Sequence, residues 1–307
     1  MGRRRKSGRP VNGWLILDKP VGMTSTAAVA LVKRTLDARK AGHAGTLDPL
    51  ASGCLPIALG EATKTVAFVM DGRKVYRFTV RWGAETETDD TEGAVTATSD
   101  TRPDAASIGA VLEEFTGTIS QVPPAYSAIK IAGERAYDLA REGEDVVLDA
   151  RPITVHRLDL LDCPDSDTAI FEAECGKGTY VRALARDMGR RLGTCAHVTA
   201  LRRMVVGPFD ESVMITPEDL DAEAPLQPVD AALSQIPSLR FGERDTARIR
   251  SGQAVLMRGR DAPIAEGAAY AVFDGVPVAI GEIEKGHFSP RRVFNLNENG
   301  PTRPTVD

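Results

Sequence analysis

The sequence predicts an α+β fold, with a second, smaller and strand-rich domain near the carboxyl end of the chain. Residues 75–82 alternate between apolar and polar side chains, which is the period of a β-strand with one buried face. Residues 179–192 instead carry apolar side chains at helical spacing. Beyond about residue 225, proline-spaced segments lead to two short predicted strands, 268–273 and 276–283, on either side of an Asp-Gly hairpin turn.

The remaining elements follow from caps, breakers and the spacing of apolar residues. Four glycines and two prolines in residues 41–60 predict an ordered loop with short elements rather than a regular helix. Gly193 is a suitable stop for the helix at 179–192. In chain order, the other predictions are a strand at 14–20, a helix capped by Thr24–Thr26 with Ala28, Val29, Val32 and Leu36 on one face, a helix at 104–117, and strands at 155–161 and 169–175.

The composition indicates a globular protein without a membrane segment. Of the 307 residues, 42% are hydrophobic and 26% charged, and no apolar run approaches the roughly 20 residues that cross a bilayer. The basic amino terminus lacks the apolar stretch of a secretory signal. The four cysteines form no CxxC pair and the four histidines are scattered, so we expect no disulfide framework and no metal site. A cytoplasmic location is predicted.

The net charge of −5 argues weakly against a nucleic-acid partner, but the charges are segregated along the chain. A basic arm occupies residues 1–10, and much of the acid lies in residues 85–92 and 142–145. We therefore expect an RNA-binding face with phosphate contacts from the arm and from a second basic cluster. That cluster, opposed only by Asp187, consists of Lys177, Arg182, Arg186, Arg190, Arg191, Arg202 and Arg203.

Residues 42–49, GHAGTLDP, are the sharpest candidate for a functional site. Gly42 and Gly45 allow the backbone to turn tightly and approach a ligand closely. Asp48 precedes Pro49, which restricts its backbone and so limits where its side chain points. An ordinary turn begun by an Asp-Pro pair explains the same residues, so this segment alone leaves a structural role open.

A phosphate-binding loop of the nucleotide-hydrolase type is unlikely on the spacing. Cys175–Thr179 lies between a predicted strand and a predicted helix, but Phe171 stands where the first glycine of such a loop is needed. Gly178 stands where Ser or Thr would bind magnesium. An alternative use of Lys177 is contact with an RNA phosphate at the helix amino terminus.

Tyr76 and Arg182 are candidates with ordinary alternatives. Tyr76 shares a strand face with Phe78, Val80 and Trp82, which fits a tyrosine of the sheet face. Arg182 lies on the first turn of the helix at 179–192, where most arginines are solvated. An arginine near the buried edge of a helix can instead hold a carboxylate by two hydrogen bonds.

Six blocks in fixed order give the chain a family resemblance over residues 13–219. It resembles the tRNA pseudouridine-55 synthases, the TruB family of pseudouridine synthases. The resemblance implies a mixed, largely antiparallel central sheet with flanking helices. The blocks are GWLILDKPVGMTS, AGHAGTLDPLASGCLPIALGEATK, KVYRF, QVPPAYSAIKIAGERAYDLAREG, GKGTYVRALARDMGRRLG and AHVTALRR.

The resemblance also implies roles for seven residues. Asp48 matches the catalytic nucleophile of the family's GHxGxLDP motif, and Arg182 matches the arginine that pairs with it. Tyr76 matches the active-site tyrosine that stacks on the target base and is a candidate to take a proton from the sugar. The other matches are His43, which supports the loop opened around the flipped base, Tyr180 and Leu201, which line the uracil pocket, and Lys64, a basic residue at the site whose role is less settled.

The implied reaction needs neither a cofactor nor a metal. It cuts the bond between C1′ and N1 of uridine, turns the uracil and rejoins it through C5, so nothing is gained or lost. A carboxylate such as Asp48 is ionised at neutral pH and can attack C1′ or assist a deprotonated sugar intermediate; residue types leave both routes open. Flipping the nucleotide costs a few kcal/mol, which stacking on Tyr76 and insertion of His43 would offset.

The resemblance implies a stand-alone enzyme that acts on the T-arm of tRNA at uridine 55, as a monomer without an obligate protein partner. Two alternatives stay open: a tRNA-folding chaperone with incidental catalysis, and a guide-RNA-directed relative. The predicted parts of the chain are a disordered basic arm at 1–10, a catalytic domain at 11–225, a small domain at 226–296 and a disordered tail at 297–307. For the small domain two roles stay open: a PUA-like domain that binds RNA, or a cap on the first domain without RNA contact.

Overall fold

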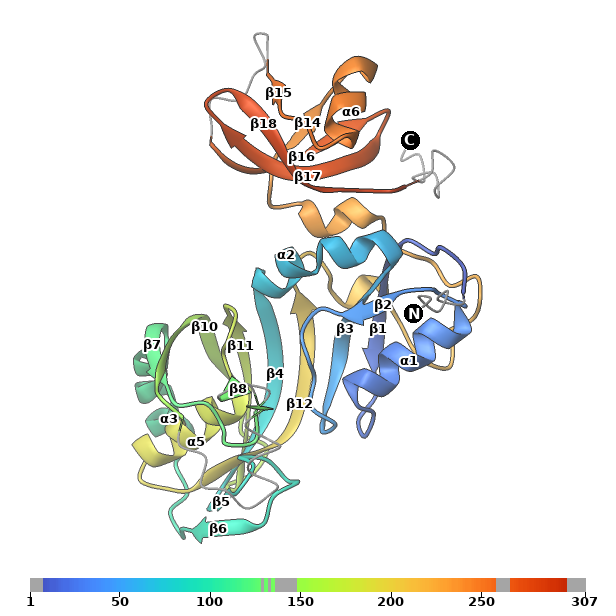
Figure 1. Ribbon diagram of the computed structural model, residues 1–307. Coiled ribbons are helices and arrows are strands. Elements are labelled where there is room, and N and C mark those ends of the chain that lie inside the picture. Colours follow the sequence, from blue (N-terminus) through green and yellow to red (C-terminus); the bar gives the residue numbers. More distant parts are fainter. Residues whose placement is uncertain (1–7, 128–129, 132–133, 136–147, 258–265, 297–307) are drawn as a thin grey trace.

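The computed structural model describes residues 8–127, 130–131, 134–135, 148–257 and 266–296 (Figure 1). The predicted basic arm before residue 8 and the tail at 297–307 lie outside these residues, as does much of the block that begins at Gln121. Within the described part, no helix is long and apolar enough to cross a membrane.

A nine-stranded sheet forms the body of the larger domain. It is mixed and largely antiparallel, as predicted: only β1 with β13 and β3 with β12 pair in parallel. The strands, in sheet order, are β13 (Met214–Ile215), β1 (Gly13–Lys19), β3 (Ala51–Leu59), β12 (Ala196–Val206), β4 (Lys74–Trp82), β11 (Thr168–Cys175), β10 (Arg151–Asp162) and β7 (Gly117–Gln121), with β2 (Ala41–His43) paired to β3.

Helices flank this sheet where the sequence predicts them. Helix α1 (Ser25–Thr35) packs on β1 and β3, and the Thr24 hydroxyl caps it by accepting from the backbone N–H of Ala27. Helix α5 (Val181–Arg191) packs on β12 and β4 (Figure 1). The remaining elements of this domain are α2 (Val66–Asp71), α3 (Ala105–Val111), the 3-10 helices η1 (Gly60–Lys64), η2 (Leu112–Phe115) and η3 (Glu211–Val213), and the short strands β5 (Ala84–Thr86), β6 (Val95–Thr98), β8 (Lys130–Ile131) and β9 (Glu134–Arg135).

The prediction of a loop over 41–60 is wrong for its second half, which is the buried strand β3. Proline in a central strand normally removes a ladder hydrogen bond. Here the Pro56 carbonyl accepts a hydrogen bond from the Ala44 N–H, on the edge of β3 that faces away from β1. The N–H that proline lacks would point to the same edge. On that side β12 pairs only with residues 51–53 and β2 with residues 57–59, so the proline falls in the gap.

Strand β12 was not predicted, although it lies near the middle of the sheet. Its sequence, AHVTALRRMVV, alternates poorly because bulges interrupt its register with β4 after Val198 and after Arg203. The strand nevertheless joins the two halves of the sheet, since β3 pairs with one edge of it and β4 with the other. It thereby brings Leu201 and Arg203 beside the segments around Asp48 and Tyr76.

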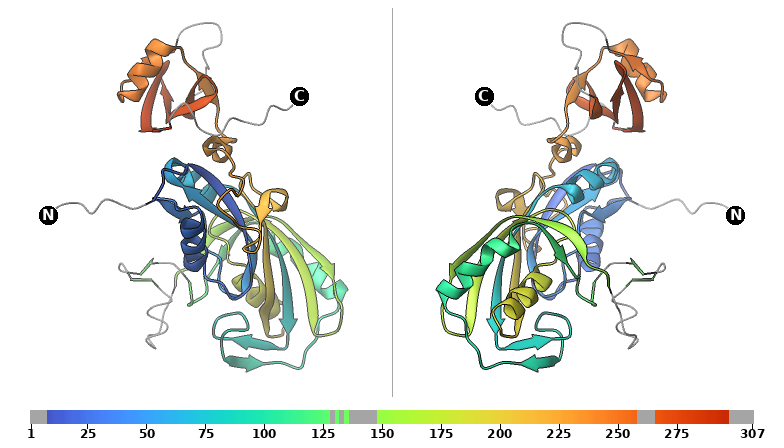
Figure 2. Two further views of the ribbon diagram at one scale, coloured as in Figure 1. Left: turned by 90° about the vertical axis from the view of Figure 1, so that its right-hand side faces the viewer. Right: turned by 90° about the vertical axis from the view of Figure 1, so that its left-hand side faces the viewer.

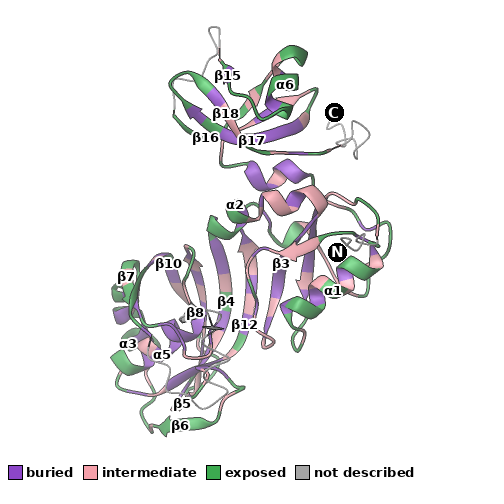
Figure 3. Ribbon diagram, viewed as in Figure 1, coloured by how far each residue is buried: buried purple, intermediate pink, exposed green. Residues whose placement is uncertain are grey.

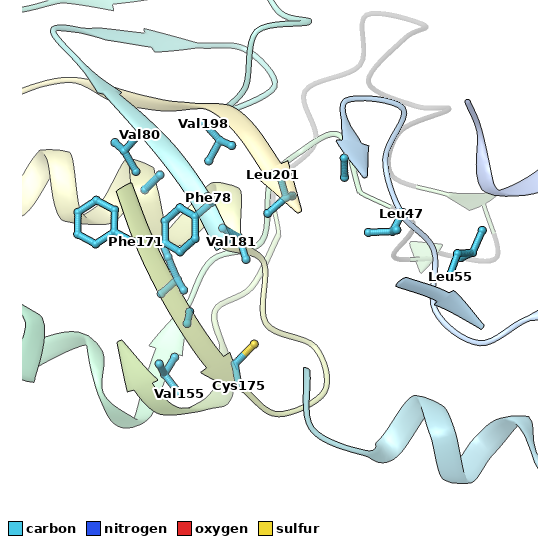
Figure 4. Packing of buried hydrophobic residues seen from close by; sticks show 14 of the residues in the cluster. Leu47, Leu55, Phe78, Val80, Val155, Phe171, Cys175, Val181, Val198 and Leu201 are labelled. Carbon is cyan, nitrogen blue, oxygen red and sulfur yellow. The ribbon is translucent and has the colours of Figure 1, made fainter. Parts of the chain in front are cut away.

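Aromatic rings fill the core on the predicted apolar face of β4. Phe78 stacks on Phe171 of β11 with ring centroids 5.4 Å apart, and Trp82 meets the edge of Phe171 at 6.3 Å. Figure 4 shows these two phenylalanines beside Val181 of α5, on the same side of the sheet. The alternation read from residues 75–82 is thus confirmed, because Phe78, Val80 and Trp82 are buried while Arg77 and Arg81 are exposed.

The second sheet forms a β-rich domain at the carboxyl end, as predicted. Asp274 and Gly275 both have positive φ, which is the turn geometry expected of an Asp-Gly hairpin. Helix α6 (Glu243–Arg250) packs on this sheet, and Ile249 and Phe288 lie in its separate core. The strands, in sheet order, are β14 (Ser238–Arg240), β16 (Gly267–Phe273), β17 (Val276–Glu284), β18 (His287–Val293) and β15 (Val255–Leu256).

A linking segment and a shared apolar cluster join the two domains. Gln227 exchanges two backbone hydrogen bonds of 2.8 Å with Trp14, and η4 (Val229–Leu233) follows it under the second sheet. Trp14, Ile280 and Phe294 belong to one buried cluster that spans the junction. Figure 2 shows the linking segment, in light orange, between the two domains, and Figure 3 colours much of its short helix as buried.

Phe171→Ala tests the aromatic core. Phe171 is fully buried between two rings, so we expect its loss to lower the free energy of unfolding by about 3–5 kcal/mol. Urea unfolding followed by circular dichroism measures the change. The control Val95→Ala, at an exposed position on β6, should change it by less than about 0.5 kcal/mol; equal effects would contradict the packing.

Candidate active site

A pocket of about 330 Å³ opens where the loop before β3 meets β4, β12 and the start of α5. Five of the seven predicted site residues line it, although they lie far apart in sequence. The remaining lining residues include three cations on one wall, Lys74, Lys177 and Arg203. The predicted residues that line the pocket are Asp48, Tyr76, Tyr180, Arg182 and Leu201.

Arg182 lies behind Asp48 and holds its carboxylate at the pocket. Its Nη2 is 2.8 Å from Asp48 Oδ2, and the guanidinium is almost completely buried, whereas the Asp48 side chain is 39% exposed. The same guanidinium donates to the carbonyls of Thr88 at 2.7 Å and Tyr126 at 3.0 Å. One carboxylate oxygen thus meets a fixed cation while the group stays open to the pocket.

Asp90 is a second carboxylate on Arg182 that sequence reasoning missed. Its Oδ2 is 3.3 Å from Arg182 Nη1, and its side chain is only 1% exposed. Its Oδ1 accepts from the Thr88 hydroxyl at 2.5 Å and from the backbone N–H of Glu92 at 2.9 Å. The only sequence signal was the acidic run at 85–92, which by itself does not say which basic residue it meets.

The expectation that Asp187 alone opposes the 177–203 cluster is wrong, because acids from other segments pair with its cations. Arg186 Nη1 is 2.9 Å from Asp89 in a buried pair, and Arg190 Nη2 is 2.7 Å from Glu85. With Arg182 on Asp90, arginines spaced four residues apart on α5 meet three acids of the 85–90 segment. The contact of this cluster with RNA stays a prediction. Its other pairs are Lys177 with Asp71, Arg182 with Asp48, Arg186 with Asp187, Arg191 with Glu114, and Arg202 with Asp18 and Glu211.

The loop that carries Asp48 is tied down on both sides of the aspartate. The Ser25 hydroxyl at the start of α1 both donates to the Leu47 carbonyl and accepts from the Leu47 N–H, each at 2.9 Å. Buried Lys19 donates to the carbonyls of Met23 at 2.7 Å and Pro49 at 3.5 Å. Asp48 also begins a turn, since its carbonyl accepts from Ala51, so the turn and the pocket use the same residue.

Tyr76 presents its ring to the pocket from β4. Burial raises the pKa of its phenol, although the charge and hydrogen bond of Arg203 act in the opposite direction. The phenol is therefore neutral at physiological pH. Leu201 of β12 lines the same pocket and pairs in register with Phe78, two residues along from Tyr76. An aromatic face and an aliphatic side chain here suit a planar, flipped base.

Tyr180 is fixed by a buried glutamine. Gln121 donates to the Tyr180 carbonyl at 3.1 Å and accepts from its N–H at 2.9 Å, as a strand neighbour would. Burial raises the pKa of the Tyr180 phenol, and the Ser127 hydroxyl near it opposes that rise. These contacts fix the backbone that enters α5, so they also orient Arg182 two residues later.

His43 and Lys64 do not line this pocket. His43 ends β2, paired with Ile57, and leads directly into the loop that carries Asp48. Lys64 lies at the domain junction, where its Nζ is 2.6 Å from Glu61 and 2.8 Å from the Val293 carbonyl. Lys64 lines a different hollow of about 310 Å³, together with Arg291, Arg292 and seven other residues of both domains.

Among residues 8–127, 130–131, 134–135, 148–257 and 266–296, no group of three or more His, Cys, Asp or Glu side chains could hold a metal ion. The pocket offers the carboxylates of Asp48 and Asp71, the phenols of Tyr76 and Tyr180, and several cations. Such a set suits nucleophilic attack and stabilisation of a nearby anion.

Comparison of the sequence and the fold with known proteins identifies the class of protein to which this chain is similar. Residues 33–181 match the family model for the TruB family pseudouridylate synthase N-terminal domain, and residues 182–234 match that for the tRNA pseudouridylate synthase B C-terminal domain. Among solved structures, a Cbf5-Nop10-Gar1 complex matches with a TM-score of 0.70 and 26% identity over 92% of this chain and 84% of its own. The predicted pseudouridine synthase fold is confirmed.

Curated relatives narrow the class to one family. The tRNA pseudouridine synthase B of Bradyrhizobium diazoefficiens is 60% identical over 304 residues, covering 95% of this chain and 88% of the relative. That of Rhodopseudomonas palustris is 59% identical over 307 residues, covering 96% and 84%. The chain belongs to the TruB family of pseudouridylate synthases.

The buried Lys19 makes the free energy of unfolding depend on pH. Burial lowers the pKa of its ammonium to about 8 from 10.5, although Asp48 acts in the opposite direction. Between these values the unfolded chain binds a proton that the folded chain does not, so the free energy of unfolding rises with pH. Between pH 8 and 10.5, the free energy of unfolding of the wild type should rise by on the order of 3 kcal/mol relative to that of Lys19→Met. Urea unfolding at a series of pH values measures this difference.

Lys177→Met is the matched control, because the Lys177 side chain is 72% exposed at the rim of the same pocket. The difference in free energy of unfolding between Lys177→Met and the wild type should stay constant over the same pH range. A flat difference for Lys19→Met as well would contradict the assignment of a depressed Lys19 pKa.

Proposed function

We propose that this protein is a tRNA pseudouridine synthase that converts the T-loop uridine at position 55 to pseudouridine. The observation that carries the proposal is the 2.8 Å pair of the buried Arg182 with the half-exposed Asp48, in one pocket with the Tyr76 ring. Family membership supports the reaction, and the names of relatives 59–60% identical support tRNA as the substrate.

Asp48 is the proposed catalytic carboxylate. It attacks C1′ as the C1′–N1 bond breaks and its electron pair leaves with the uracil, or it assists after a proton has been removed from the sugar. The uracil then turns and its C5 bonds to C1′. On the first route the bond between Asp48 and C1′ breaks in this step and its electron pair returns to the carboxylate; on the second the sugar regains its proton. The C5 proton is then lost and N1 is protonated. Arg182 keeps the carboxylate aimed, because Asp90 and two carbonyls fix the guanidinium from behind.

Tyr76, Tyr180 and Leu201 are the proposed walls of the uracil site. The pocket admits a single flipped nucleotide, and stacking on Tyr76 offsets part of the cost of unstacking it. His43 is proposed to support the opened RNA loop from the base of the Asp48 loop. Lys64, at the junction hollow with Arg291 and Arg292, is proposed to contact RNA outside the pocket rather than the reacting nucleotide.

The proposed enzyme is cytoplasmic, works as a monomer on the tRNA T-arm and uses its carboxyl-terminal domain as a PUA-like RNA-binding unit. Lys177 at the pocket rim is one phosphate contact, because it is 72% exposed and its pair with Asp71 lies at the surface, where such pairs are weak. The guide-directed alternative is weaker, because relatives more than twice as identical as the Cbf5 chain are named as tRNA enzymes.

Asp48→Asn tests the site and separates catalysis from tRNA folding. We expect pseudouridine formation in an unmodified tRNA transcript to fall by about 10³-fold or more, because the amide cannot replace the carboxylate. Chemical mapping of pseudouridine, without added metal or nucleotide, measures it, and filter binding should show tRNA still bound.

The control is Asp71→Asn, which changes an exposed carboxylate on the rim of the same pocket. It should leave the rate within about threefold of wild type. An inactive wild type would remove the proposed function, whereas full activity of Asp48→Asn would remove only the site assignment.

A further inference from the structure

Arg203 is a buried arginine at the pocket that sequence reasoning placed only in a general basic cluster. It lies on β12, in register with Tyr76 of β4 on one side and with Gly53 of β3 on the other. Its side chain is fully buried, and it lines the pocket that contains Asp48. Its neighbour Arg202 points to the opposite face of the strand and pairs with Asp18 and Glu211.

The guanidinium of Arg203 joins both flanks of the Asp48 loop. Its Nε donates to the Cys54 carbonyl at 2.8 Å, and its Nη2 donates to the Gly45 carbonyl at 3.0 Å. Its Nη1 is 3.3 Å from the Thr46 carbonyl, two residues before Asp48. Five donors in a rigid plane suit three carbonyls of this kind, which the single nitrogen of a lysine cannot reach together.

The loop is shaped to receive this side chain. Gly45 has a φ of +96°, and a Cβ there would lie 3.4 Å from Arg203 Nη1 in a conformation that other residues rarely adopt. The close approach expected of Gly45 is therefore an approach to Arg203. Gly53, at +95°, would place a Cβ 2.3 Å from the Arg203 carbonyl, so β3 also depends on glycine beside this residue.

The same side chain lies beside Tyr76, its partner in register on β4, and both residues line the pocket. The charge of Arg203 acts on the Tyr76 phenol, where it opposes the rise in pKa that burial causes. Among the residues that the structure describes, no carboxylate lies within ion-pair distance of Arg203, and its guanidinium donates to carbonyls. A buried cation without a carboxylate is costly unless its position matters elsewhere. Here its position links the Asp48 loop, through these carbonyls, to the strand that carries Tyr76.

We propose that Arg203 is a positioning residue for the reaction, whose guanidinium fixes the Asp48 loop and the Tyr76 ring relative to each other. Arg182 orients the carboxylate itself, whereas Arg203 sets the distance between the carboxylate and the ring on which the base stacks. The inference rests on the proposed function, because its kinetic effect is measured on pseudouridine formation. A displacement of about 1 Å between reacting groups can reduce a rate about 10²-fold.

Arg203→Lys is the test variant, because it keeps the buried charge and loses the planar set of donors. We expect kcat on the tRNA transcript to fall about 10²-fold while KM stays within about twofold, since RNA contacts outside the pocket are untouched. Arg202→Lys, one residue along the same strand, is the matched control and should keep both constants near wild type. A wild-type kcat for Arg203→Lys, or a change in KM alone, would overturn the proposal.

A second readout needs no activity. In protein labelled with ¹³Cζ-tyrosine, Tyr76→Phe assigns one resonance among the five tyrosines. Arg203→Lys should shift that resonance at neutral pH, because the phenol loses the planar guanidinium beside it, and Arg202→Lys should leave it in place. An unmoved resonance, or failure of Arg203→Lys to fold, would show that Arg203 serves stability alone; an inactive wild type with a shifted resonance would count against the proposed function only.

Discussion

The ion pair between Arg182 and Asp48 is the interaction on which the arrangement of the pocket depends. The carboxylate must stay exposed to meet a substrate, whereas the arginine must be buried to stay in place. Burying a guanidinium is costly unless its donors find partners, and the two terminal nitrogens of Arg182 meet Asp48, Asp90 and the carbonyls of Thr88 and Tyr126. The acidic segment at 85–92 is thereby a structural support of the active site.

The loop that carries Asp48 is held by cations that donate to carbonyl oxygens. Lys19 holds the carbonyl of Pro49, and Arg203 holds those of Gly45, Thr46 and Cys54. This arrangement fixes the backbone around Asp48 and leaves its carboxylate to pair with Arg182. It also explains why a segment rich in glycine is ordered, since the backbone freedom of glycine is removed by side chains from other elements.

Pairing within the chain changes how its charge bears on RNA binding. The arginines of α5 appear in the sequence as a dense basic run, but acids from residues 85–90 and Glu114 neutralise most of it. A net charge of −5 is then compatible with an RNA partner only if exposed cations gather elsewhere. Lys177 at the pocket rim and Arg291 and Arg292 at the domain junction are such positions. Lys177 pairs with Asp71 and Arg291 with Glu282, but both pairs are exposed and therefore weak.

The sequence by itself determined the elements whose period is local: the alternating strand β4, the amphipathic helix α5 and the hairpin at Asp274–Gly275. It also determined the family, because the ordered motif blocks can be recognised without knowing which residues contact one another. Strands β3 and β12 escaped prediction, since glycines, a proline and register shifts disturb their alternation.

Only the tertiary structure decided which charges meet. Asp48 and Arg182 are 134 positions apart in the numbering, and nothing in a helical period distinguishes Arg182, which reaches the pocket, from Arg186, which pairs with Asp89. Lys64 and Arg203 show the same limit. Lys64 was expected at the site but lies at the domain junction, whereas Arg203 was not expected there but lines the pocket from the middle of the sheet. Partner choice is set by packing between distant segments, which no local pattern encodes.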